Sequence, residues 1–143
     1  MAVKKNVHIE SLRIKPPKNV EVIETPITIH WFDENGIMYV MSKKVERTME
    51  YYSMVINVYA SFVKEKGKLC TLSDTHNTMP MSKEVRDYLT KEMPKYIKAQ
   101  AVITDEPLNG SKFKTFLSLS LKGFKVALFS NEKDAKKWLK EQL

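Results

Sequence analysis

The side chains of this sequence that could do chemistry gather in the stretch Lys68–Ser82, KLCTLSDTHNTMPMS. An apolar strand core at 69–72 leads into Ser73 and Asp74, a polar loop follows at 75–78, and Ser82 opens a predicted helix. In open α/β sheets, ligands usually sit where the carboxyl end of a strand feeds a helix N-terminus. We therefore expect any site of this protein to lie in this stretch.

The candidate ligand- or partner-binding residues come from that loop, from the helix start and from the end of the next predicted strand: Asp74, Thr75, His76, Thr78, Ser82 and Asp105. Carboxylates and imidazoles are the usual general acids and bases of enzymes. Acid–base catalysis would require Asp74 and His76 to meet a further group from another strand end, and Asp105 is the best placed. A strand-end aspartate more often caps its own loop through an Asx-turn.

Other catalytic chemistries lack their residue patterns. The three histidines (His8, His30, His76) are far apart, and neither H-x-x-x-H nor C-x-x-C occurs, so we expect no metal. Cys70 lies inside an apolar strand without a basic neighbour in sequence, which predicts an inert thiol. The four glycines are isolated, which excludes a phosphate-binding loop. We expect a protein that is not an enzyme and holds no cofactor.

The composition is that of an ordinary globular domain. The chain has 143 residues, of which 43% are hydrophobic and 29% charged, and no apolar run is long enough to cross a bilayer. A single cysteine excludes an internal disulfide, and a buried free thiol fits a reducing compartment, so we expect a cytoplasmic protein.

The net charge of +7 favours anionic partners in general. Most of the positive residues are lysines, some of them clustered on the N-terminal arm and the last helix, and there are only three arginines. Because nucleic-acid-binding proteins rely on arginine and interleaved aromatic residues, we do not expect nucleic acid as a partner.

The chain divides into a basic arm at 1–19 and one domain at 20–143. In the arm, Val7 and Ile9 alternate with polar residues and predict a short edge strand that Pro16 and Pro17 stop. Residues 20–43 predict a β-meander whose hairpin turns at Asn35-Gly36, the strongest short hairpin signal.

Residues 45–65 predict the longest helix, ended by Gly67. Two apolar stripes cover more of its circumference than packing on a sheet requires. Another helix, a second subunit or an apolar ligand must cover the excess, and we expect a homodimer.

The remaining elements alternate between helices and strands. Helices are predicted at 82–97 (with Pro94 ending or kinking the first), at 111–121 and after a Ser130 cap, and strands at 101–104 and 124–129. This order predicts a mixed sheet with parallel strands and right-handed crossovers.

Three stretches carry a resemblance to a known fold: SKEVRDYL (82–89), YIKAQAVITDEPLNGSKFKTFL (96–117) and KVALFSNEKDAKKWL (125–139). With this element order, the chain resembles the SpoIIAA-like (STAS-like) domains and is most similar to a small uncharacterised bacterial STAS-like family. The resemblance implies an α/β fold in which a hairpin or meander precedes α-β-α-β-α-β-α.

The resemblance also implies a function. It suggests a non-enzymatic regulatory or protein-interaction module. The alternative is a carrier or sensor of a lipid or other apolar ligand, bound between the long helix and the sheet. Antagonists of this type carry a phosphorylatable serine in an Asp-Ser-x-Gly pattern, where this chain has Asp74-Thr75-His76-Asn77. Thr75, Thr78 and Ser82 are the remaining hydroxyl acceptors.

Overall fold

The structure is a computed structural model of the chain and describes residues 7–74, 76–105 and 124–143. These residues form an α/β fold around one mixed sheet of six strands, arranged in chain order. The strands are β1 (Ile23–Glu24), β2 (Thr28–Phe32), β3 (Met38–Ser42), β4 (Leu69–Asp74), β5 (Ile97–Ile103) and β6 (Lys125–Phe129). The first three are antiparallel, and β3 to β6 run parallel.

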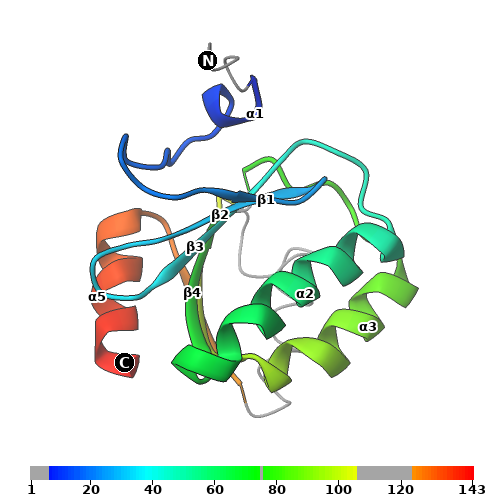
Figure 1. Cartoon of the computed structure of the whole chain (residues 1–143). Helices are drawn as coiled ribbons and strands as arrows, with labels where there is room; N and C mark the ends of the chain where they lie inside the picture. Colours follow the sequence, from blue (N-terminus) through cyan, green and yellow to red (C-terminus); the bar gives the residue numbers. More distant parts are fainter. Residues whose placement is uncertain (1–6, 75, 106–123) are drawn as a thin grey trace.

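The described helices cover both faces of the sheet. Helices α2 (Met49–Lys66) and α3 (Lys83–Glu92) lie side by side on one face, and α5 (Glu132–Gln142) packs on β4, β5 and β6 from the other (Figure 1). Strand β4 lies next to β3, and β5 lies next to β4 on the side away from β3, so both connections cross the sheet in the same direction. Right-handed crossovers therefore put α2 and α3 on the same face.

The predicted hairpin is confirmed. Strands β2 and β3 pair from Thr28 opposite Ser42 to Phe32 opposite Met38. Gly36 adopts a φ of 83°, the left-handed region that glycine enters without strain. The Asp33 carboxylate fixes the turn by accepting the backbone N–H groups of Asn35 and Ile37.

The predicted helices shift at their ends because of local capping. Helix α2 begins at Met49, because the Thr48 hydroxyl accepts the Tyr51 N–H, and it ends at Gly67 as predicted. Helix α3 ends at Glu92, where Pro94 falls in a short 3₁₀ turn, so β5 starts at Ile97 rather than at 101. The cap of α5 is Asn131 and not Ser130. The helix predicted at 111–121 lies outside the described residues.

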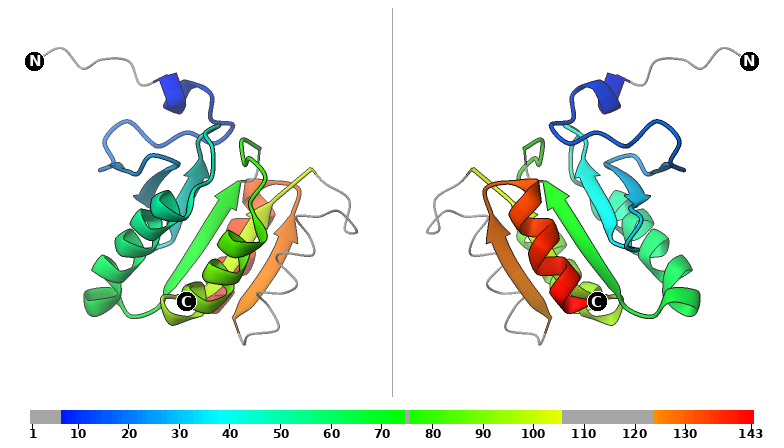
Figure 2. Two further views of the ribbon diagram at one scale, coloured as in Figure 1. Left: turned by 90° about the vertical axis from the view of Figure 1, so that its right-hand side faces the viewer. Right: turned by 90° about the vertical axis from the view of Figure 1, so that its left-hand side faces the viewer.

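The arm does not form the predicted edge strand. Val7–Glu10 make one helical turn, α1, followed by an irregular segment with bends and turns that leads to β1. Ile9 and Leu12 are three residues apart, which puts them on the same side of such a turn, and both pack on the α5 side of the core. The arm crosses the end of the sheet at which the parallel strands finish (Figure 2).

The two faces of the sheet differ in polarity. The face toward α5 is apolar, with Ile29, Trp31 and Leu72 fully buried or nearly so. The face toward α2 and α3 also carries polar residues on β2, β3, β4 and β5: Thr28, His30, Ser42, Thr71, Ser73 and Gln100. A parallel sheet covered on both sides normally has nearly continuous apolar strands. The polar face is therefore the exceptional feature of this core.

His30 is the most deeply buried titratable group on the polar face. Its side chain is completely buried, Nε2 lies 2.7 Å from the Thr28 hydroxyl, and the ring meets the Tyr59 ring edge to face. Burial lowers the pKa of His30 to about 4. The imidazole is therefore neutral in the folded protein at neutral pH.

This pKa predicts a loss of stability in mild acid. Between about pH 6.5 and pH 4 the unfolded chain binds a proton at His30 that the folded chain does not, so the free energy of unfolding falls as the pH falls. We expect a loss of about 1–2 kcal/mol between pH 7 and pH 5, measured by urea unfolding. His30→Gln should flatten that slope, whereas His76→Gln, which removes an exposed imidazole, should keep it. Equal slopes for His30→Gln and wild type would contradict the assignment.

Candidate functional site

Asp74 and Asp105, from neighbouring strand ends, are brought together by a residue of the arm. Arg13 donates to both carboxylate oxygens of Asp74, with Nε 2.9 Å from Oδ2, and its Nη1 lies 2.6 Å from Asp105 Oδ2. Asp74 is 4% exposed and Asp105 71% exposed. The hydrogen bond to Asp74, followed by that to Asp105, raises the pKa of Arg13 further above its ordinary value. Arg13 thus ties the arm to the carboxyl ends of β4 and β5.

The other predicted site residues do not join this cluster. The backbone N–H of His76 donates to Asp74 Oδ1, but its side chain is exposed. Thr78 donates its hydroxyl to Ser42 Oγ at 3.0 Å. Ser82 is the N-cap of α3 and accepts the Val85 N–H. Thr75 lies outside the described residues.

The polar groups at the strand ends are already engaged within the protein. The Asx-turn predicted for Asp74 is present, and its oxygens are also occupied by Arg13. In the described parts of the chain, no three His, Cys, Asp or Glu side chains gather in a way that could hold a metal ion. Cys70 is a buried free thiol whose pKa is raised by burial, as expected of an inert cysteine.

Beside the Asp74 cluster, a cavity of about 90 Å³ lies between the sheet and the two helices α2 and α3. Its helix side is apolar and aromatic, with Tyr52, Val55 and Tyr59 from α2 and Leu89 from α3. Its sheet side is largely polar: Thr28, Ser42, Ser73, Asp74 and Gln100, with Val40 among them. Thr78 and Met81 line it from the loop before α3. An apolar wall facing a few polar groups is the usual make-up of a small-molecule site.

Arg47, immediately before α2, supplies a buried positive charge to the cavity wall. Its side chain is nearly inaccessible, and its Nη atoms donate to the carbonyl oxygens of Lys43 (3.1 Å) and Ile27 (3.4 Å). Burial lowers the pKa of Arg47, an effect that Tyr52 opposes. Among the described residues, no carboxylate forms an ion pair with Arg47, whereas buried Lys43 is paired with Glu24 at 2.9 Å.

Several polar atoms near the cavity lack a hydrogen-bond partner within the described residues. They include Arg47 Nε and Gln100 Oε1, both on residues that line the cavity, and Thr71 Oγ1 and His30 Nδ1 on the same face of the sheet. Leaving such an atom buried without a partner costs about 1–3 kcal/mol. The Gln100 amide nitrogen donates to Ser73 Oγ at 2.8 Å, so the unpaired atom of this side chain is its carbonyl oxygen.

Sequence reasoning missed Arg13, Arg47 and Gln100. The signal for Gln100 was present: Thr71, Ser73 and Gln100 interrupt strands that a doubly covered parallel sheet would keep apolar. Arg13 and Arg47 carried no such signal, because both lie outside regular elements and find their partners only through the tertiary fold.

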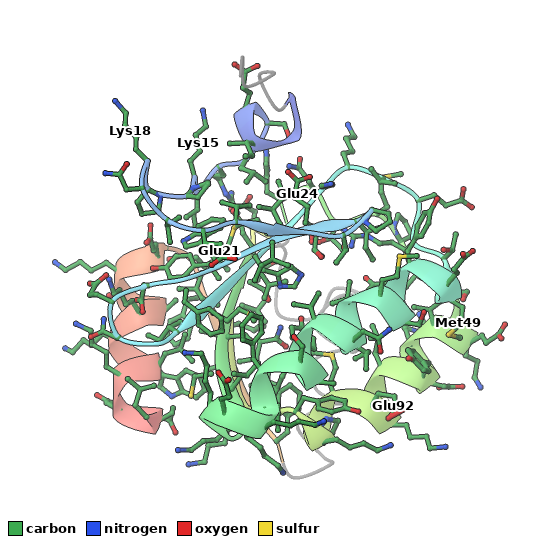
Figure 3. The ribbon with its side chains drawn as sticks, viewed as in Figure 1. Lys15, Lys18, Glu21, Glu24, Met49 and Glu92 are labelled. Atoms are coloured by element: carbon green, nitrogen blue, oxygen red, sulfur yellow. The ribbon has the colours of Figure 1, made fainter. Side chains whose placement is uncertain are left out.

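The Arg13 cluster predicts a specific loss of stability. Arg13→Met leaves the buried Asp74 carboxylate with one backbone donor among the described residues, so we expect the free energy of unfolding to fall by about 1–2 kcal/mol, after allowing for solvent screening at the partly exposed guanidinium. Lys18→Met is the matched control, because Lys18 extends away from the fold (Figure 3), and its effect should stay within about 0.5 kcal/mol. Urea unfolding at low and high salt measures both. Equal effects of the two variants would refute the role given to Arg13.

Among the described residues, no helix combines the length and the apolar character needed to cross a membrane. No curated protein matches the chain. Residues 30–143 match the family DUF7793, described as a domain of unknown function. This match covers most of the chain, from the middle of β2 through α5. The protein therefore belongs to the DUF7793 family.

Proposed function

We propose that the protein is a non-enzymatic regulatory module that binds a small molecule in the cavity between the long helix α2 and the sheet. The observation that carries this proposal is the cavity lining: an apolar helix side, a polar sheet side and buried polar atoms that no described residue satisfies. A ligand with polar and apolar parts would complete these hydrogen bonds and cover the aromatic wall.

The state of the strand-end residues supports a binding role over catalysis. A general base needs a carboxylate or imidazole that can reach a substrate proton. Asp74 is held by Arg13 and by its own loop, and the His76 side chain does not contact it through any hydrogen bond in the described residues. Asp105 is bound to the same arginine.

The size of the cavity favours a small ligand over a long-chain lipid. Sites for drug-sized ligands typically measure about 300–1,000 Å³. The cavity here measures about 90 Å³. One ordered water needs about 10–15 Å³ of such volume, so the cavity has room for roughly six to nine non-hydrogen atoms. We therefore narrow the apolar-ligand alternative to a compact amphipathic molecule.

A SpoIIAA-like fold and a cytoplasmic location remain part of the proposal. The antiparallel hairpin that leads into successive strand–helix units is consistent with the former, and the buried free thiol of Cys70 with the latter.

Homodimerisation remains a prediction. Helix α3 packs against α2 and covers part of its apolar surface, so one of the expected coverings is supplied within the chain. Met54 is 39% exposed, and Val58 and Phe62 are half-buried. A protein partner at this outer side of α2 would serve the regulatory role equally well. Size-exclusion chromatography with light scattering separates monomer from dimer.

Filling the cavity should abolish ligand binding. We expect compounds of a small-metabolite library to stabilise the wild-type protein, by about 2.7 kcal/mol at a concentration one hundred times Kd, as read from thermal unfolding. Val55→Phe adds a ring on the cavity wall and should remove that stabilisation. Val58→Phe is the matched control, since Val58 lies on the same helix but does not line the cavity, and it should bind as wild type does.

Two results would refute this function. One is that no compound stabilises the folded wild-type protein and native mass spectrometry finds no co-purifying molecule. The other is that Val55→Phe, with a normal circular dichroism spectrum, binds as well as wild type. If Val55→Phe does not fold, Ser73→Val alters the opposite wall and takes its place.

A further inference from the structure

We propose that the ligand of this cavity is an anion, a small carboxylate with an apolar body, and that Arg47 binds its charge. The inference rests on the proposed function and adds the chemical class of the ligand. Its starting point is that Arg47 lines the cavity, is 6% exposed and has no acidic partner among the described residues.

Arg47 differs from Lys43, the other buried cation among the described residues, in the groups that surround it. Lys43 is equally buried but donates to Glu24 Oε2 and to the carbonyl oxygen of Thr25. Arg47 donates to neutral carbonyl oxygens and lies 5.8 Å from the centre of the Tyr52 ring, but no carboxylate among the described residues balances its charge and its Nε has no hydrogen-bond partner among them. Buried charges are normally paired, since taking a lone ion out of water is costly. A ligand anion is the missing counter-charge that would account for this guanidinium.

The helices add to the positive potential at this end of the cavity. Arg47 directly precedes the N-terminus of α2, and Met81 lines the cavity just before the N-terminus of α3. The N-terminal ends of helices carry partial positive charge and favour anions. Asp74, the one acidic residue of the described lining, is bound to Arg13, which it shares with Asp105. Because its carboxylate is already engaged by Arg13, Asp74 is not the partner of Arg47, whose charge is left without an acidic partner in the described lining.

The other lining residues indicate the chemical nature of the rest of the ligand. Beyond Arg47, the helix side offers Tyr52, Val55, Tyr59 and Leu89, which suit an aromatic or branched aliphatic body. A carboxylate can accept from the guanidinium and from the hydroxyl group of Ser42, which lines the cavity and accepts from Thr78 without using its own proton. Charge-assisted hydrogen bonds of this kind are about twice as strong as neutral ones.

The test uses three probes of the same size and shape that differ in charge: benzoate, benzamide and benzamidine. Each is titrated into the full chain and followed by two-dimensional NMR, with isothermal calorimetry for Kd. We expect benzoate to bind at least about tenfold more tightly than benzamide, benzamidine to bind weakest, and the shifted signals to come from residues of the cavity wall. Butyrate and butyramide repeat the comparison with an aliphatic body.

Variants assign the preference to Arg47. Arg47→Met should reduce the ratio between benzoate and benzamide to about one, while Arg47→Lys should retain a preference for the anion. Lys44→Met removes an exposed charge of the same loop and should leave the ratio unchanged. The comparison of probes in the wild-type protein needs no variant, so the test stands even if Arg47→Met does not fold.

The outcomes distinguish this inference from the proposed function. Equal or tighter binding of benzamide or benzamidine in the cavity would overturn the anion preference and leave the binding function intact. A preference that survives in folded Arg47→Met would overturn the role of Arg47. If no probe of either series binds, a small carboxylate is not the ligand, and the library screen with Val55→Phe decides separately whether the cavity binds anything.

Discussion

The need to cover both faces of the parallel strands determines this structure. Strands β4 and β5 lie inside the sheet, so each face must be buried against another layer. Right-handed crossovers place α2 and α3 together on one face, which leaves the other to α5 and the arm. The apolar excess of the long helix follows from this, because α2 must contact both the sheet and α3. The arm belongs to the same solution, since Leu12 and Arg13 close the end of the face that α5 leaves open.

The polar face under α2 is a departure from that rule and costs stability. An apolar residue at the position of Thr71 or Gln100 would remove a buried atom without a partner. Places where a sequence breaks a packing rule without an evident structural gain are often functional sites. Arg47 and Gln100 line a single cavity, and His30 and the Thr71 hydroxyl lie on the same face of the sheet. That concentration favours a shared purpose over separate packing defects.

Much of the fold followed from local patterns. The Asn35-Gly36 turn, the Gly67 cap and the alternation of apolar segments predicted the hairpin, the end of the long helix and the mixed sheet, because each depends on backbone preferences of a few adjacent residues. The errors arose where neighbours compete. Thr48 caps α2 in place of an earlier start, Asn131 takes the role expected of Ser130, and the short run at Val7 and Ile9 fits a helical turn as well as a strand. The candidate site was only partly predictable: Asp74, Asp105 and Thr78 lie at it, but the arginines reach it through contacts between residues far apart in the chain.

The position of Asp74 has a consequence for the chain as a whole. Its carboxylate binds Arg13 of the arm, and the same residue forms part of the cavity wall. If the proposed ligand changes this contact when it binds, docking of the arm and occupancy of the cavity are linked equilibria. The free energy by which a bound molecule would strengthen the contact between Arg13 and Asp74 equals the free energy by which the docked arm would strengthen the binding of that molecule. The part of the arm around Arg13 is thus placed where it would respond to a change in the interior of the fold.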